Sequence, residues 1–262
     1  MYQRPSEPLS IGGVLDNGIQ LFKASVVKTF PLALVAGLIS SLPQIYTQIT
    51  GLGAYETALL GDSMGTVLGM VLITSLLALA AYLAVLSIQD AISNNRTMAI
   101  DEAVLAGLTR LPGMLGATIL YMAAIMVGTI LLIVPGIVIS VYWILFAIAV
   151  VSDRKGPLQS LGYSYQLIKG YWWRSAAILG VMGIIAMVLY AALIMLVVGG
   201  VINAPGSEES TGLVVFTSLA TALVSAAVAP LYYAILLVMY NDLKLRRGGD
   251  DLLRRAESTV SA

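Results

Sequence analysis

The stretch MLGATILYMAAIMVGTILLIVPGIVISVYWILFAIAVV, residues 114–151, decides the fold class, because it contains no charged side chain. It holds two apolar runs, 114–134 and the shorter 137–151, separated only by Pro135 and Gly136. A helix needs about 20 apolar residues to cross the hydrocarbon core of a bilayer. Proline suits the first turn of a helix, where its missing N–H is not needed. The stretch therefore predicts a tight helical hairpin inside a membrane.

Further apolar runs lie on both sides of this hairpin, and polar loops separate them. The six runs predicted to span the membrane are residues 30–49, 67–92, 114–134, 137–151, 176–202 and 213–240. They predict an all-α membrane protein with six transmembrane helices. The expected organisation is a single integral membrane domain over 1–262, with a cytoplasmic interfacial helix (1–29), a six-helix bundle (30–240) and a cytoplasmic tail (241–262).

The composition agrees with a membrane protein and excludes much chemistry. Hydrophobic residues make up 59% of the 262 residues and charged residues only 11%, whereas soluble domains carry about 25% charged residues. The chain has no Cys and no His, which removes thiol nucleophiles, disulfides, imidazole bases and the usual zinc ligands. No ionisable residue falls in the middle of a predicted span. We therefore predict no enzyme activity, no catalytic residue, no cofactor and no metal site.

The basic residues predict the orientation, because Lys and Arg stay on the cytoplasmic side during insertion. With six spans, all 14 Lys and Arg residues fall on the side that holds both termini. The loops on the other side hold no basic residue and four acidic ones, Glu56, Asp62, Glu208 and Glu209. Both termini are therefore predicted to be cytoplasmic.

Three stretches that precede spans have apolar residues at helical spacing and polar residues between them. When they are aligned, Leu15, Leu105 and Leu161 coincide, and six residues later Leu21, Leu111 and Leu167 coincide. This pattern predicts three units, each a cytoplasmic interfacial amphipathic helix followed by a transmembrane hairpin. The alternative is that any helix between a loop and a span is amphipathic, without a repeat.

Small residues recur at intervals that are typical of helix packing in lipid. The sets are Gly65 and Gly69, then Ala176 and Gly180, and finally Ser218, Ala222 and Ala226. We expect these faces to contact other helices. Whether the partner helix belongs to the same chain or to a second copy stays open.

Cations and aromatic residues gather at the expected inner surface, where they suit anionic lipid headgroups. The candidate headgroup contacts are Arg154, Lys155, Lys169, Tyr171, Trp172, Trp173 and Arg174. The alternative is an interfacial belt that only fixes the depth of the helices.

Three residues are candidate helix breaks, namely Pro135, Gly136 and Pro230. Pro230 lies inside the sixth span and frees the carbonyl of Ala226. Such a break can mark a binding site in a transporter. The alternative is a plain kink, in which a neighbouring hydroxyl satisfies the free carbonyl.

Residues 131–179, LLIVPGIVISVYWILFAIAVVSDRKGPLQSLGYSYQLIKGYWWRSAAIL, resemble the central region of the YciC-like family of uncharacterised bacterial inner-membrane proteins. They are also similar to the membrane domain fused to some glycerophosphodiester phosphodiesterases. The shared features are the turn at 134–137, the pair Asp153 and Arg154, Gly156, the aromatic residues at 171–174 and the N-terminal stretch 9–22. The resemblance implies the bacterial cytoplasmic (inner) membrane and no established activity.

These observations predict a non-enzymatic membrane protein that binds lipid or a partner, as a scaffold or accessory factor in envelope homeostasis. The expected partners are membrane lipids and either another membrane protein or a second copy, with no nucleic acid. The alternative is a transporter or exporter component for a small amphiphilic substrate. A cavity lined by Tyr82, Tyr121, Tyr190 and Tyr232 would favour that alternative, and a filled core would favour the first hypothesis.

A cysteine placed at residue 60 or at residue 208 should react with a membrane-impermeant thiol reagent added to intact cells. Both positions lie in loops that are predicted to face the outside. The chain has no cysteine of its own, so the label reports the new residue alone. Labelling that appears only after lysis would contradict this topology.

Overall fold

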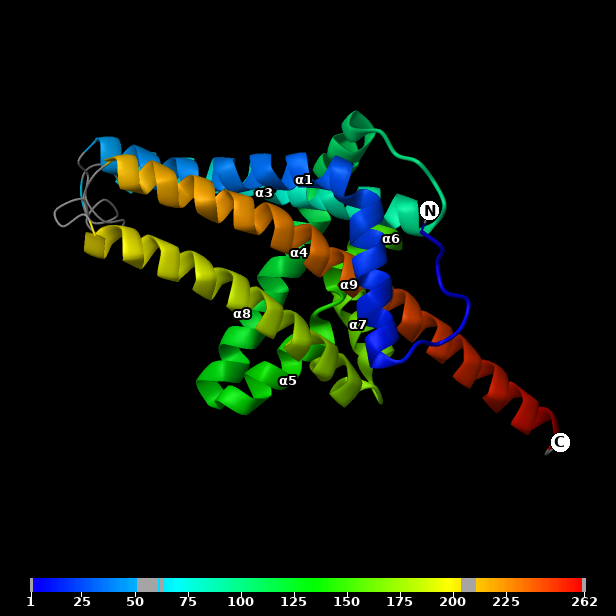
Figure 1. Ribbon diagram of the computed structural model, residues 1–262. Helices are drawn as coiled ribbons and strands as arrows, with labels where there is room; N and C mark the ends of the chain where they lie inside the picture. Colours follow the sequence, from blue (N-terminus) through cyan, green and yellow to red (C-terminus); the bar gives the residue numbers. More distant parts are fainter. Residues whose placement is uncertain (1, 51–60, 62–63, 204–210, 261–262) are drawn as a thin grey trace.

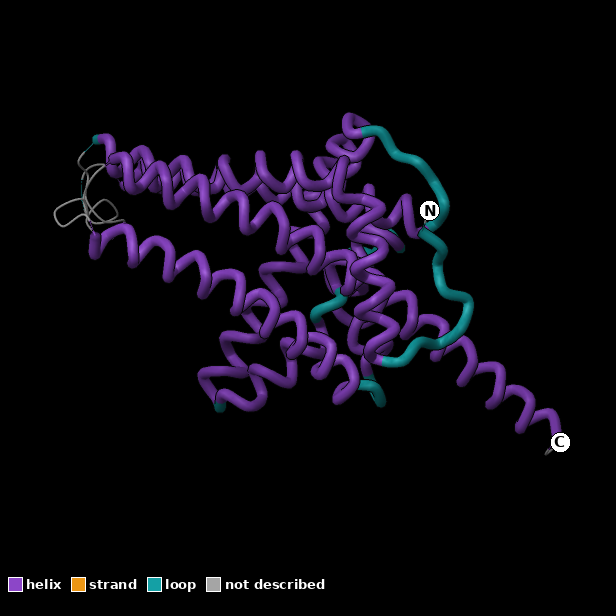
Figure 2. Tube along the Cα trace, in the orientation of Figure 1, coloured by secondary structure: helices purple, strands orange, loops and turns teal. Residues whose placement is uncertain are grey.

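The computed structural model describes residues 2–50, 61, 64–203 and 211–260, and these residues form helices and loops without a strand (Figures 1 and 2). The helices are α1 (Ile11–Ile49), α3 (Met64–Ser93), α4 (Ile100–Leu131), α5 (Ile133–Trp143), α6 (Phe146–Ser152), α7 (Pro157–Ile168), α8 (Trp172–Asn203) and α9 (Thr211–Val260). Positions 60 and 208 and the acidic residues Glu56, Asp62, Glu208 and Glu209 lie outside the described residues.

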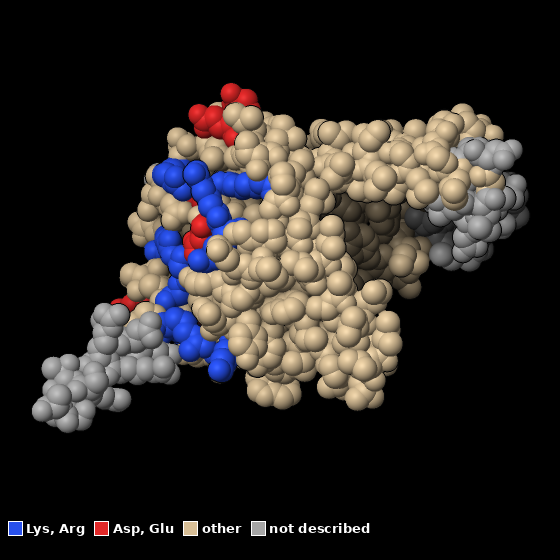
Figure 3. Space-filling model, turned by 180° about the vertical axis from the view of Figure 1, so that it is seen from behind, with Lys and Arg blue, Asp and Glu red and all other residues tan. Residues whose placement is uncertain are grey.

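Within the described residues, six helical segments are long and apolar enough to cross a membrane, which confirms the predicted fold class. The fourth segment combines α5 and α6 over Ile133–Ser152. Lys and Arg side chains gather at one end of the molecule (Figure 3), which is also the end where both termini lie (Figure 1). The described residues of the opposite end show no Lys, Arg, Asp or Glu surface in this view.

The three expected interfacial helices do not form three equivalent elements. The first is the beginning of α1, which continues to Ile49 and bends on the way (Figure 1). Pro31 explains this bend, because its backbone nitrogen has no hydrogen to donate to the carbonyl of Val27. The second is the beginning of α4. Only the third, α7, is a separate helix, because Gly170 with φ of +89° turns the chain before α8.

The hairpin at the centre of the chain turns at Leu132, three residues before the expected break at Pro135 and Gly136. Leu132 is extended, and Pro135 lies in the first turn of α5, where an N–H has no helical partner. The two arms are close, since a Cβ on Gly128 would lie 3.1 Å from the Cα of Gly136. The break was therefore predicted in the right loop but at the wrong residues.

The fourth span contains a second interruption, at Ile144 and Leu145, which the sequence analysis missed. Ser164 of α7 stabilises it from both sides. Its hydroxyl accepts a hydrogen bond from the Leu145 N–H at 3.1 Å and donates one to the carbonyl of Tyr142 at 2.8 Å. A buried backbone N–H or carbonyl without a hydrogen-bond partner destabilises a protein, and Ser164 gives both of these groups a partner.

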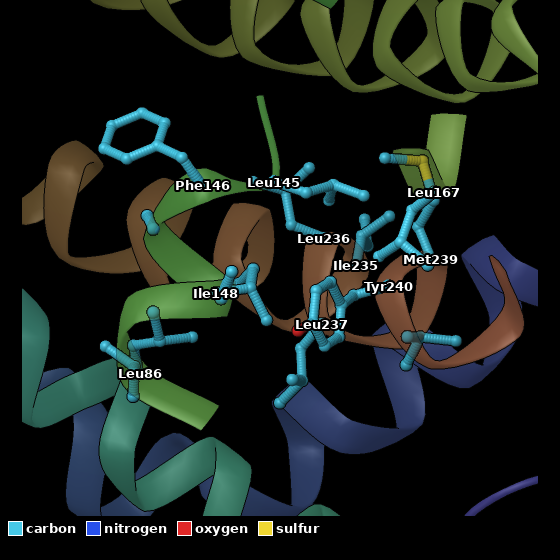
Figure 4. Packing of buried hydrophobic residues seen from close by; sticks show 14 of the residues in the cluster. Leu86, Leu145, Phe146, Ile148, Leu167, Ile235, Leu236, Leu237, Met239 and Tyr240 are labelled. Carbon is cyan, nitrogen blue, oxygen red and sulfur yellow. The ribbon is translucent and has the colours of Figure 1, made fainter. Parts of the chain in front are cut away.

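The core fills the half of the molecule nearest to the termini. Residues 146–151 of α6 and 234–243 of α9 are buried on every side, as expected for a helix that is enclosed by others. Leu237, Tyr240 and Ile148 are among the largest fully buried side chains (Figure 4).

Close packing within the chain confirms the set Ser218, Ala222 and Ala226 and includes Ala176, which packs against the core, but it does not include Gly65, Gly69 or Gly180. Ala222 and Ala226 are buried, and a Cβ on Gly37 of α1 would lie 3.0 Å from the Cα of Ala222. By contrast, a Cβ on Gly65, Gly69 or Gly180 would meet nothing within 4 Å. Spacing alone cannot tell a lipid-facing glycine from a packed one.

The last two helices do not pair as a tight hairpin. In Figure 1, α8 diverges from α9 along much of its length, and Ile184, Met187 and Met195 of α8 are exposed. α9 instead packs along α1, where Gly18 lies against Ile235. The structure therefore does not confirm three equivalent hairpins.

Gly107→Ala should lower the free energy of unfolding by about 1–3 kcal/mol, the typical cost of overpacking. The new Cβ would clash with the carbonyl oxygen of Ala80 and lie 3.1 Å from the N of Ala84. Gly180→Ala is the matched control, because its Cβ meets open space and alanine favours the helix. Thermal unfolding in detergent measures both variants. Equal melting temperatures would contradict the α3–α4 packing.

Candidate functional site

The seven residues predicted to contact lipid headgroups separate into two groups in the structure. Arg154 and Lys155 lie in the loop between α6 and α7, whereas the other five follow α7. The second group is largely engaged with the protein itself. The first group borders a groove, which makes it the stronger candidate.

Arg174 is a structural residue, which corrects its prediction as a headgroup contact. Its Nη2 donates hydrogen bonds to Asp242 Oδ2 at 2.9 Å and to the carbonyl of Leu9 at 2.8 Å. Asp242 is only 2% exposed and also accepts from Arg246 Nε at 3.0 Å and from the Leu9 N–H at 2.7 Å. This network ties the N-terminal segment to α8 and α9.

The aromatic residues before and at the start of α8 fit the alternative of an interfacial belt. The indole N–H of Trp172 donates to the carbonyl of Val138 at 3.4 Å. The Tyr171 ring lies below the guanidinium groups of Arg246 and Arg247, at 5.8 and 5.6 Å from its centroid. Trp173 is 82% exposed, and an exposed indole at this level anchors a helix at the membrane surface. Lys169 is exposed as well.

The groove beside Arg154 and Lys155 has a volume of about 630 Å³, and we call it the basic groove. α4 contributes Arg110, which the sequence analysis did not single out. Arg110 donates a hydrogen bond to Ser87 Oγ at 2.6 Å, which orients its guanidinium. Its remaining N–H groups are donors that a ligand can use.

The charge of the basic groove is unbalanced. Glu102 is the only acidic residue that lines it, and its carboxylate accepts the Ala99 N–H as a helix cap. Within the described residues, Arg154 makes no side-chain hydrogen bond or ion pair, and its backbone has a φ of +52°. Lys155 lies 4.2 Å from the ring centroid of Tyr163. Burial raises the pKa of Tyr163, so this ring stays neutral beneath the cation.

An apolar groove of about 570 Å³ continues from the basic groove, and the two share Gly156. Its walls are Gly116, Ile119 and Leu120 of α4 with Pro157, Leu158 and Gln159 of α7. Ile119 and Leu158 are strongly exposed. A cationic pocket that opens into an apolar channel has the chemical order of a phospholipid, with the headgroup followed by a chain.

A second polar pocket, of about 330 Å³, lies near the ends of α3 and α6. Its carboxylates are already engaged, and Arg4 donates a hydrogen bond to Asn94 Oδ1 at 3.0 Å. Asp153 receives hydrogen bonds from Lys244 Nζ at 3.1 Å and from the Tyr240 hydroxyl at 2.8 Å, while Asp90 accepts from the Ser152 hydroxyl at 2.6 Å. This pairing makes the pocket a structural connection between α6 and α9 rather than a site for an external ion.

Pro230 does not break α9, which runs through it from Thr211 to Val260. The carbonyl of Pro230 accepts a hydrogen bond from Gln89 Nε2 at 2.7 Å, from a fully buried side chain of α3. This is the carbonyl of Pro230 itself and not the carbonyl of Ala226 that the proline frees, so the hydroxyl partner expected for Ala226 stays a prediction. The unbroken course of α9 agrees with the alternative in which Pro230 does not interrupt the helix.

The four tyrosines proposed as the lining of a cavity lie in different places. Tyr121 and Tyr232 belong to the packed core. Tyr82 lines a cavity of about 420 Å³ bounded by α1, α3, α8 and α9, which we call the hydroxyl cavity. Tyr190 borders the same region through its hydroxyl, which lies 3.1 Å from Ser225 Oγ. Both an open cavity and a filled core are therefore present, in different halves of the molecule.

Asp242→Asn should lower the free energy of unfolding by about 2–3 kcal/mol, because it removes a buried carboxylate that is hydrogen-bonded to two partly buried arginines. The loss should also release the N-terminal segment, which limited proteolysis detects as faster cleavage before residue 11. Asp16→Asn is the control, because Asp16 is exposed on α1. Equal unfolding and cleavage of the two variants would contradict the role of Asp242.

Comparison of the chain with family models, curated proteins and solved structures gives no match. The candidate site is a cationic groove at the end of the molecule that holds the termini, joined to an apolar groove along α4 and α7.

Proposed function

We propose that this multi-pass membrane protein is a non-enzymatic binder of anionic phospholipid, which acts as a scaffold or accessory factor in envelope homeostasis. Its expected location is the bacterial inner membrane, with both termini in the cytoplasm. The observation that carries the proposal is the junction of the basic groove with the apolar groove at Gly156.

The cations of the basic groove suit a phosphate diester. Arg110, Arg154 and Lys155 supply three positive charges against the single carboxylate of Glu102. Hydrogen bonds from guanidinium to phosphate are charge-assisted and stronger than neutral ones. Each basic residue near an anionic membrane surface contributes about 1 kcal/mol to binding.

The apolar groove distinguishes a lipid from a free phosphate. Ile119 and Leu158 border it, and both side chains expose large apolar surfaces. In the membrane such a surface is covered by acyl chains, so the groove favours a ligand whose chain enters it from the bilayer. A free phosphate compound gains nothing from this surface.

The proposal of a non-enzymatic role rests on the residues available. The chain has neither His nor Cys, and the described part contains no group of three acidic residues that could hold a metal ion. The acidic residues Asp153 and Asp242 are engaged by Lys and Arg. A carboxylate held in this way is a poor general base.

Arg154→Gln combined with Lys155→Gln should weaken the binding of phosphatidylglycerol roughly ten- to thirtyfold, because two headgroup contacts of about 1 kcal/mol each are lost. Native mass spectrometry of the full chain, titrated with the lipid in detergent, measures the dissociation constant. Phosphatidylcholine and glycerol phosphate should bind more weakly to the unaltered protein than phosphatidylglycerol.

The matched control removes two cations elsewhere at the same end of the chain, by Lys23→Gln combined with Lys28→Gln, since neither residue lines the basic groove. This variant should bind like the unaltered protein. If both double variants lost the same affinity for phosphatidylglycerol, the loss would be due to general surface charge and not to the basic groove. Equal binding of glycerol phosphate would assign the basic groove to a free phosphate compound.

A transporter or exporter component for a small amphiphile is the second candidate, and the hydroxyl cavity favours it. Tyr82 and several Ser and Thr residues line this cavity, while the packed core closes the half nearest to the termini. A carrier would have to open that core during transport. Movement of a fluorescent amphiphile across proteoliposomes distinguishes a carrier from a scaffold.

A further inference from the structure

The hydroxyl cavity is a second site, separate from the basic groove and built from different side chains. Ser40 and Gln44 of α1, Tyr82 of α3, and Thr217 and Thr221 of α9 line it. Its volume of about 420 Å³ falls within the range of small-molecule pockets, about 300–1,000 Å³. Figure 3 shows this end of the molecule hollowed, without Lys, Arg, Asp or Glu surface in the hollow.

We propose that the hydroxyl cavity binds an uncharged amphiphile whose head carries free hydroxyl groups, as in a monoacylglycerol. This inference is independent of the function proposed for the basic groove. It concerns a ligand of different charge at the opposite end of the helices.

The hydrogen-bonding groups that line the hydroxyl cavity favour a ligand head that donates hydrogen bonds. Ser40 and Thr217 already donate their hydroxyl hydrogens to carbonyls of their own helices, to Ala36 at 2.8 Å and Val214 at 3.0 Å. Each hydroxyl oxygen keeps lone pairs that can accept. The cavity therefore has spare acceptors, and an alcohol supplies the donors that they lack.

Ser218 provides an independent indication of a ligand. It lines the cavity and is only 6% exposed, yet its Oγ has no hydrogen-bond partner. Buried hydroxyl groups in proteins are nearly always paired. A rotation of the Ser218 side chain toward the cavity would let a hydroxyl-bearing head give this group a partner.

The absence of charge among the described lining residues excludes an ionic head. A charged group in a hydrocarbon environment needs a counter-charge, and without one its burial costs several kcal/mol. The sequence adds a further barrier to anions, because the loops predicted to lie outside carry only acidic residues.

The tail of the amphiphile has a route into the bilayer along α8. Leu193 and Ile194 of this helix line the cavity, and Ile194 is also exposed on the outside of the molecule. A chain that leaves the cavity past Ile194 would reach lipid directly. The head and tail would then lie in surroundings that match their polarity.

A photoactivatable monoacylglycerol, with the reactive group near its head, tests the proposal on the full chain in nanodiscs. Peptide mapping should place the crosslinks on the cavity-lining parts of α1 and α9. Excess unlabelled monoacylglycerol should abolish them, while a fatty acid anion or an alkylammonium of equal chain length should not. Equal competition by either charged amphiphile would overturn the proposal.

Thr217→Val combined with Thr221→Val removes two lining hydroxyls without changing side-chain size, and should weaken binding about tenfold. Thr29→Val is the control, because its buried hydroxyl bonds to Ser25 O in the inner half of α1. Unchanged crosslinking of the double variant would overturn the proposal. If the double variant fails to fold, the competition experiment on the unaltered protein still decides.

Discussion

The carboxylate of Asp242 is the interaction on which the inner half of the molecule depends. It joins the chain at Leu9, the start of α8 at Arg174 and the last helix at Arg246. A buried charge is stable only when its partners are in place. Each of these segments therefore needs the other two. Because Leu9 precedes α1 and Asp242 lies in α9, the segment before α1 reaches its final contacts only after α9 has been synthesised.

The Lys and Arg residues that gather at the end of the molecule holding both termini have two different roles. Arg174, Arg246 and Lys244 find carboxylates and hold helices together. Arg154 finds none among the described residues and faces a groove. The positive-inside bias thus supplies internal ion pairs as well as orientation. What separates a structural cation from a binding cation here is whether the carboxylate of an aspartate reaches it.

Features that depend on neighbouring residues could be predicted from the sequence, whereas contacts between residues far apart in the chain could not. The spans were predictable because apolar length is a local property. The interruption at Leu145 was not, since its partner Ser164 lies 19 positions away on another helix. Arg174 was assigned to lipid for the same reason, because Asp242 lies 68 positions away. Arg154 and Lys155 border a real groove, but Arg110 completes it from α4, and no local pattern joins these three residues.

The tip of the α4–α5 hairpin is exposed and wholly apolar from Leu131 to Val134. It offers water no polar side chain, so its most favourable surroundings are acyl chains rather than headgroups. α5 adds only 11 residues, about 16 Å, before the chain is interrupted. The fourth membrane-spanning segment is completed only by α6, whose residues 146–151 are buried in the protein. Lipid therefore meets this span mainly along α5.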